Sequence, residues 1–164
     1  MLSFGENEKI LKLLKKYGKD ILNSDSFKSE MRYIQHGTIS CYEHSMAVAY
    51  MSISIALRQK KHVDMRSLVR GALLHDYFLY DWHEKKQGHG LHGFFHAGIS
   101  LRNARRDFIL NKIEENIIYR HMFPLNISRI PNCKESAIVC IADKICALYE
   151  TFGIKAYSTD ILIA

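Results

Sequence analysis

The sequence is poor in proline and contains no long apolar run. Its two prolines, Pro124 and Pro131, lie in the last third of the chain, so most of the 164 residues are free of the strongest helix breaker. No apolar stretch approaches the roughly 20 residues that a membrane-spanning helix requires. The first residues also lack the basic and then apolar order of a signal peptide. These absences predict a cytoplasmic protein with no membrane partner.

Cysteine pairs with the spacing of zinc sites or redox motifs are absent as well. We interpret the cysteines as reduced thiols in the core of a cytosolic protein, in preference to disulfides or a zinc site. No C-x-x-C pair occurs among the four of them, which are Cys41, Cys133, Cys140 and Cys146.

The charge is strongly positive, but the chain has no basic arm or tail. The formal net charge is +6 and the sequence pI is about 9.1, which favours anionic partners. Basic residues are dispersed and occur at most in pairs such as Lys15-Lys16 and Arg105-Arg106. This dispersal argues against nucleic acid and favours a phosphorylated small molecule or a nucleotide as partner. The sequence does not indicate an oligomeric state.

Alternation of apolar and polar residues, the mark of strands, is nearly absent, whereas helical periodicity recurs along the chain. We therefore predict an all-α helical bundle that forms a single domain over residues 1–164. Ser40 and Glu43 have the spacing of a capping box, and Asp64 can cap the next helix. The predicted helices cover residues 5–22, 24–35, 40–60, 64–79, 92–108, 113–121 and 135–152.

Two further segments have special compositions. Residues 135–152 are apolar around most of the helical circumference, which predicts a central buried helix. Residues 81–91 contain two glycines and several charges and are interpreted as a loop, in which Trp82, His83 and His89 could line a site.

The doublet His75-Asp76 lies inside an apolar run of the sequence. A buried carboxylate beside an imidazole is costly unless hydrogen bonds, a counter-charge or a metal satisfy both. Alone, the doublet is better explained as a structural ion pair. Its interpretation therefore depends on which other polar residues face the same core.

Several other helices place a metal-competent residue on an inward face. His44 shares a helical stripe with apolar residues, His121 ends its helix, and His96 lies on a face with Ile99. Asp143 lies in the most apolar helix and needs a cationic partner. Lys144 is not the obvious one, because neighbouring helical residues point about 100° apart. Together with His75-Asp76, these residues indicate a metal site, and mixed imidazole and carboxylate donors suit Zn, Fe, Mn, Co or Ni better than Ca.

The order of these residues resembles the HD-domain superfamily of metal-dependent phosphohydrolases. The resemblance rests on the segments YEHSMAVA, GALLHDYFLYD and IVCIADKICALYE. It implies a bundle of five or more core helices over about residues 34–152, with the N-terminal helix of about residues 5–22 packed on it. It also implies a metal at the centre of the bundle, held by His44, His75, Asp76 and Asp143.

Members of the superfamily with two metals carry extra histidines between the doublet and the last aspartate. His96 and His121 match those positions, and Asp76 would then bridge two ions. In the segment HGFFHAG, His92 competes with His96. We prefer His96, because the two-metal branch usually has His-Pro near a glycine and this chain has His96-Ala97-Gly98. The Gly-Tyr-Pro signature of the cyclic-dinucleotide phosphodiesterase branch is absent from the sequence. Whether one or two ions bind stays open.

The resemblance implies hydrolysis of a phosphomonoester or phosphodiester, possibly of a nucleotide, by a metal-bound hydroxide. Asp76 would hold the metal, Lys144 or Arg120 would contact the phosphate, and His36 would contact the substrate or donate a proton. Two alternatives remain open. A minority of the superfamily uses two irons to activate oxygen, and a catalytically silent module could keep the site for nucleotide binding and regulation.

Overall fold

A computed structural model describes residues 4–59, 62–80 and 92–153 of the chain. The loop predicted at residues 81–91, with Trp82, His83 and His89, lies outside the described residues, as does the segment after residue 153. The prediction of an all-α fold is confirmed. The elements are α1 (Phe4–Leu22), α2 (Asp25–Lys28), the 3₁₀ helix η1 (Ser29–Arg32), β1 (Ile34–His36), β2 (Ile39–Ser40), α3 (Cys41–Leu57), α4 (Met65–Leu74), α5 (His92–Asp107), α6 (Lys112–Arg120) and α7 (Lys134–Thr151).

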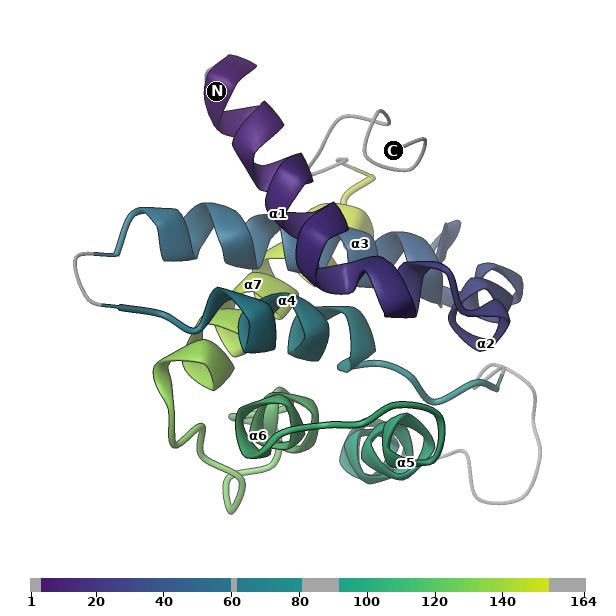
Figure 1. The fold of residues 1–164 in the computed structure, drawn as a ribbon. Helices are drawn as coiled ribbons and strands as arrows, with labels where there is room; N and C mark the ends of the chain where they lie inside the picture. Colours follow the sequence, from purple (N-terminus) through teal and green to yellow (C-terminus); the bar gives the residue numbers. More distant parts are fainter. Residues whose placement is uncertain (1–3, 60–61, 81–91, 154–164) are drawn as a thin grey trace.

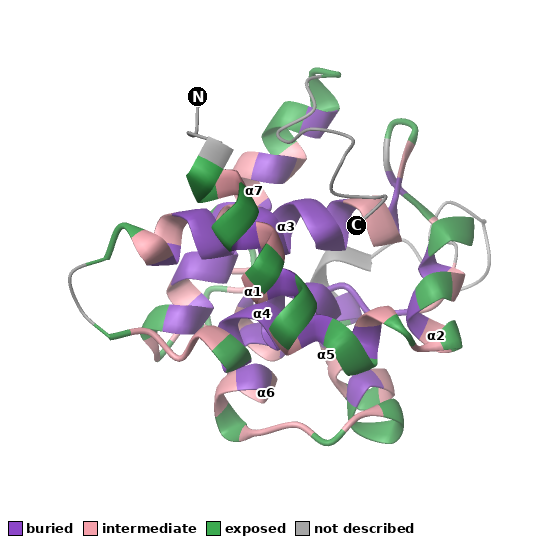
Figure 2. Ribbon diagram, turned by 45° about the horizontal axis from the view of Figure 1, so that its top comes forward, coloured by how far each residue is buried: buried purple, intermediate pink, exposed green. Residues whose placement is uncertain are grey.

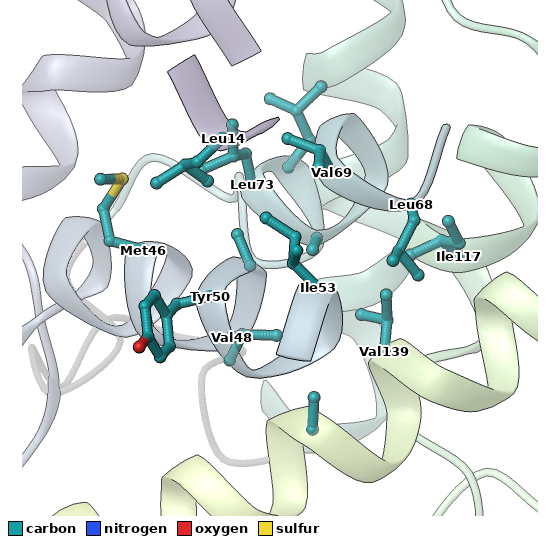
Figure 3. Close-up of a cluster of buried hydrophobic side chains, with 14 of the residues drawn as sticks. Leu14, Met46, Val48, Tyr50, Ile53, Leu68, Val69, Leu73, Ile117 and Val139 are labelled. Atoms are coloured by element: carbon teal, nitrogen blue, oxygen red, sulfur yellow. The ribbon is translucent and has the colours of Figure 1, made fainter. Parts of the chain in front are cut away.

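Helices α3 and α4 form the centre of the bundle. Helix α1 packs across both of them, α7 lies against α3, and α6 packs on α4 and α7, with α5 beside α6 (Figure 1). Apolar side chains from all of these helices meet in one buried cluster, to which α5 contributes Ala104. Figure 3 shows part of this cluster, with Leu14, Ile53, Leu68, Leu73, Ile117 and Val139 among its members. Gly71 lets α4 and α6 approach, because a Cβ there would lie 2.5 Å from Cδ1 of Ile117.

The prediction that α7 is the central buried helix is wrong. Figure 2 shows that α3 is the more completely buried helix. On α7, Ile141, Leu148 and Phe152 are 54%, 56% and 71% exposed and share one outward stripe. An apolar helix therefore has a solvent face here, which its composition alone does not reveal.

The helix predicted over residues 24–35 is also wrong in its second half. Ser24 caps the short α2 by accepting a hydrogen bond from the Phe27 N–H, and the chain then passes through η1 into a β-hairpin. Ile34 pairs with Ser40, and Gly37 turns the chain at φ 56°, a conformation that favours glycine. The Ser40–Glu43 capping box is present and starts α3 directly after the hairpin.

Helix α4 ends at Leu74, five residues before the predicted end. His75 is its C-terminal cap residue, and Leu79 adopts a φ of 60°. The Asn103 amide of α5 donates to the carbonyl groups of Tyr77 and Phe78, which no longer accept helical hydrogen bonds. The His75-Asp76 doublet therefore lies where the chain leaves a helix and enters the interior of the bundle.

None of the four cysteines forms a disulfide, and all but Cys133 are buried. No helix in the described part of the chain is long and apolar enough to span a membrane.

Candidate metal centre

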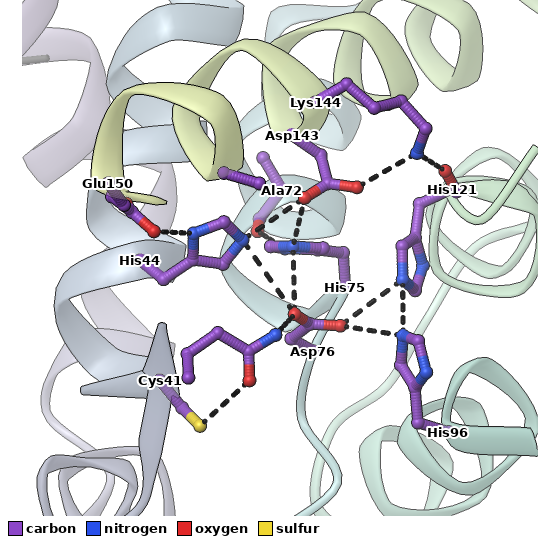
Figure 4. A network of polar contacts seen from close by, with 12 residues as sticks. Cys41, His44, Ala72, His75, Asp76, His96, His121, Asp143, Lys144 and Glu150 are labelled. Carbon is purple, nitrogen blue, oxygen red and sulfur yellow. Dashed lines mark hydrogen bonds and ion pairs between the residues drawn. The ribbon is translucent and has the colours of Figure 1, made fainter. Parts of the chain in front are cut away.

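Two groups of buried histidines and aspartates meet at the centre of the fold. Each group offers one nitrogen or oxygen atom per residue, and the three atoms of a group lie within 4.8 Å of one another. They come from α3, α5 and α7 and from the ends of α4 and α6 (Figure 4). The first group is His44, His75 and Asp143, and the second is Asp76, His96 and His121.

The first group surrounds a single point with nitrogen and oxygen atoms. Oδ1 of Asp143 lies 3.2 Å from Nε2 of His44 and 3.8 Å from Nε2 of His75. Oδ2 of Asp76 lies 3.5 Å from Nε2 of His75 and 3.8 Å from Nε2 of His44. Asp76 therefore adds a fourth donor atom to this group.

The second group is built around the other oxygen of the same carboxylate. Oδ1 of Asp76 lies 3.1 Å from Nε2 of His96 and 3.2 Å from Nε2 of His121. The two Nε2 atoms are only 2.9 Å apart. One carboxylate thus presents one oxygen to each group, which is the arrangement of a bridging ligand.

Hydrogen bonds on the far side of the imidazole rings orient them. Nδ1 of His75 donates to the Ala72 carbonyl at 2.7 Å, and Nδ1 of His121 donates to the Ile118 carbonyl at 2.8 Å. A proton on Nδ1 leaves the Nε2 lone pair directed at the centre, as metal-binding histidines require.

Two residues that contact these ligands were missed by the sequence analysis. Oε2 of Glu150 accepts from Nδ1 of His44 at 2.8 Å, and the Gln35 amide donates to Oδ2 of Asp76 at 2.5 Å. Glu150 follows Asp143 by seven residues on α7, so the two side chains lie two turns apart on the same face of the helix. This spacing could have predicted that Glu150 lies near the centre. Gln35 lies in the hairpin strand β1, which no comparable pattern in the sequence predicts.

Two buried atoms at the centre lack hydrogen-bond partners, and their chemistry shows whether a cation fits there. Nε2 of His75 and Oδ1 of Asp76 are buried and have no hydrogen-bond partner among the described residues. Both are acceptors in this arrangement, and buried acceptors without a donor are costly. A divalent cation satisfies them, and the carboxylates Asp76 and Asp143 supply the opposite charge. The residues therefore fit a divalent metal, and their donor chemistry suits the transition metals.

Protonation of the two first-group histidines differs. Burial lowers the pKa of His75 to about 4, so its Nε2 is available as a ligand at neutral pH. Burial also acts to lower the pKa of His44, but hydrogen bonds to Asp143 and Glu150 outweigh it and raise that pKa to about 10. A metal that binds to His44 therefore replaces a proton.

The structure places the other predicted residues in different surroundings. Nζ of Lys144 lies 3.1 Å from Oδ2 of Asp143 and donates to the His121 carbonyl at 2.7 Å. Lys144 is thus a cationic partner of Asp143 besides His44, contrary to our prediction, because its long side chain folds back past the 100° separation. Arg120 is not brought into the centre and donates to the Ile130 carbonyl. The side chains of His36 and His92 lie outside the described residues.

Glu150→Gln tests whether the carboxylate behind His44 tunes the centre. An amide at this position removes the negative charge that orients the imidazole and raises its basicity. We expect metal affinity to fall by about 10- to 100-fold, measured by metal titration against a competing chelator. Glu135→Gln is the matched control, since Glu135 is a buried carboxylate of the same helix that accepts from the Asp64 N–H. Equal affinities of the two variants would contradict this role of Glu150.

The comparisons with known proteins give one match. The sequence model of the HD domain matches residues 41–148, about two thirds of the chain, and this range includes all six residues of the two groups. No curated protein and no solved structure matches the chain. Members of the matched family are in general metal-dependent phosphohydrolases. The chain belongs to the HD-domain family.

Proposed function

We propose that the protein is a metal-dependent phosphohydrolase that acts on a phosphomonoester or phosphodiester of a small molecule or nucleotide. The observation that carries the proposal is the Asp76 carboxylate, which directs one oxygen to each of two buried donor groups. A divalent metal, when bound, supplies hydroxide from water near neutral pH and neutralises phosphate oxygens. The surplus of basic residues in the chain supports an anionic substrate.

The residues around the centre have separate tasks in this proposal. The histidines and aspartates hold the metal, and their hydrogen bonds to backbone carbonyls and to Glu150 keep the rings oriented. Lys144 has a partly exposed side chain beside Asp143, so its ammonium group can contact a phosphate oxygen at the edge of the centre. His36 remains the proposed substrate contact or proton donor, since the neighbouring Gln35 bonds to Asp76.

His121→Ala tests the hydrolase and the two-ion version together. The variant loses one of two nitrogen donors of the second group, so we expect it to lose one metal per chain and at least about 99% of its turnover, equal to about 3 kcal/mol. Metal content and hydrolysis of a phosphate-ester panel are measured on protein purified without chelators. His62→Ala is the control, because His62 is exposed and belongs to neither donor group.

The outcome of the same assay separates the alternatives. A His121→Ala protein with full activity and full metal content contradicts the two-ion version. Two irons per chain with oxygen consumption, and no turnover of any ester under nitrogen, would instead indicate a di-iron oxygenase. Nucleotide binding without metal-dependent turnover would indicate a regulatory module.

A further inference from the structure

A groove of about 610 Å³ lies on the outer side of α6, between α5 and the segment that precedes α7. Lys112, Asn116 and Tyr119 line it and share one face of α6, at positions i, i+4 and i+7. Glu114 and His121, also seven residues apart, are buried on the inner face toward the core and the metal centre. The groove therefore belongs to the face of α6 opposite the metal centre, and its volume suits a small-molecule ligand.

The charges along the groove are mainly positive. Arg105, Lys112 and Arg120 line it against the single carboxylate of Glu115. Glu115 accepts from Nε of Arg105 at 2.7 Å and lies 3.5 Å from Nζ of Lys112. Arg120 uses one nitrogen to bond the Ile130 carbonyl, and a guanidinium group has five N–H donors. The lining can therefore donate several charge-assisted hydrogen bonds to an anion.

A further arginine contacts Tyr119, which is one of the residues that line the groove. The guanidinium of Arg129 stacks 4.1 Å from the centre of the Tyr119 ring. Its Nη1 is buried and has no hydrogen-bond partner among the described residues. A buried cationic donor without an acceptor is costly, and a bound anion would satisfy it. This unsatisfied arginine is evidence for a ligand that is independent of the groove's shape.

We propose that this groove binds a phosphorylated ligand of nucleotide size at a site separate from the metal centre. Its phosphate is held by Lys112, Arg120 and Arg129, since guanidinium groups match phosphate oxygens in pairs. The apolar or aromatic part of the ligand packs on Leu101 and Ile113, which line the same groove. The proposal does not depend on hydrolysis at the metal centre, and it gives Arg120 a phosphate contact at a different site from the one predicted.

The test uses the full chain and the phosphonate analogue of adenosine monophosphate, in which a methylene group prevents hydrolysis. We expect isothermal titration to show binding that persists in Asp76→Asn. The double variant Lys112→Gln, Arg120→Gln should raise the dissociation constant at least about tenfold, with unchanged metal content. The matched control is Lys12→Gln, Lys15→Gln, which removes the same charge from exposed positions on α1. The control should bind within about twofold of wild type.

Two results would overturn the proposal. Affinity that is lost in Asp76→Asn and kept in the groove variant would place the ligand at the metal centre. An equal loss in the groove variant and the α1 control would show only attraction to net charge.

Lys112→Gln alone guards against a folding defect, since the Lys112 side chain is 95% exposed. This single variant should still raise the dissociation constant several-fold. Methylphosphonate, which lacks the ring, should bind at least about tenfold more weakly than the nucleotide analogue, and equal affinity would contradict the apolar contact.

Discussion

The Asp76→Asn protein is expected to lose metal-dependent turnover by at least about a thousandfold, equal to about 4 kcal/mol of transition-state stabilisation. An amide keeps the size of the carboxylate but removes its charge and replaces one oxygen with an NH₂ group. That group would face either the His44 and His75 nitrogens or the His96 and His121 nitrogens. One of the two donor groups must therefore lose the Asp76 oxygen that faces it. The kcat/KM of a phosphate-ester substrate measures the effect.

Metal content distinguishes this loss from a general defect. We expect Asp76→Asn to bind fewer ions per chain than wild type at the same free metal concentration, while its thermal unfolding in chelator is little changed. Asp25→Asn is the control, because Asp25 is an exposed carboxylate in the first turn of α2. Turnover within about tenfold of wild type in Asp76→Asn would show that a bridging carboxylate is not needed.

The two donor groups differ in charge, so their affinities should differ. The first group contains Asp143 and one oxygen of Asp76, and Glu150 strengthens His44 from behind. The second group shares only the other Asp76 oxygen, and its remaining donors are imidazoles, which contribute no negative charge. An ion in the first group is held by more negative charge, so it should be the last to leave as chelator is added. Partial removal of metal by a chelator should therefore leave one ion per chain, in the first group.

The sequence predicted which histidines and aspartates meet at the centre of the fold better than it predicted the residues that surround them. Helical spacing placed His44, Asp143 and His121 on inward faces because helix periodicity fixes direction relative to the core. The contact of Gln35 with Asp76 and that of Lys144 with the His121 carbonyl depend on side-chain reach between elements, which spacing within one element does not determine. A glutamine in a two-stranded hairpin carries no periodic signal at all.

The limits of helical pattern also explain the two wrong elements. The second half of the predicted second helix is a hairpin instead, because pairing of Ile34 with Ser40 satisfies the backbone hydrogen-bonding groups. Helical spacing within one segment does not predict such pairing. Helix α4 can stop early because the side-chain amide of Asn103, more than twenty residues later in the chain, donates hydrogen bonds to the carbonyl groups that the helix leaves free. In both cases the end of the helix depends on residues outside it, either in a partner strand or far away in the sequence.

Arg70→Ala is expected to destabilise the folded protein by about 3–5 kcal/mol, the largest effect we predict on stability. Nε of Arg70 lies 2.7 Å from Oε1 of Glu114, and both side chains are buried. The same guanidinium donates to Asp20 of α1 and to the Ile109 carbonyl. Removing it leaves the Glu114 carboxylate charged, buried and without its main partner. Urea unfolding in the presence of chelator measures the change in free energy.

Arg66→Ala is the matched control for this ion pair. Arg66 lies one turn before Arg70 on α4 and reaches the same Glu114 oxygen at 3.5 Å, but its side chain is 55% exposed. Screening by water should limit its contribution to about 1 kcal/mol or less. Equal losses in the two variants would contradict the assignment of the effect to burial.

The Arg70–Glu114 pair also connects stability to the metal centre through α6. Glu114 accepts from the Asn111 N–H in the capping box that starts this helix, and His121 is its C-terminal cap residue. A shift at the start of α6 would therefore move His121 of the second donor group. The double variant Arg70→Met, Glu114→Leu removes the unpaired charge and should recover most of the lost stability. If that variant is stable yet still binds the second ion weakly, the pair fixes the position of α6 rather than merely holding the fold together.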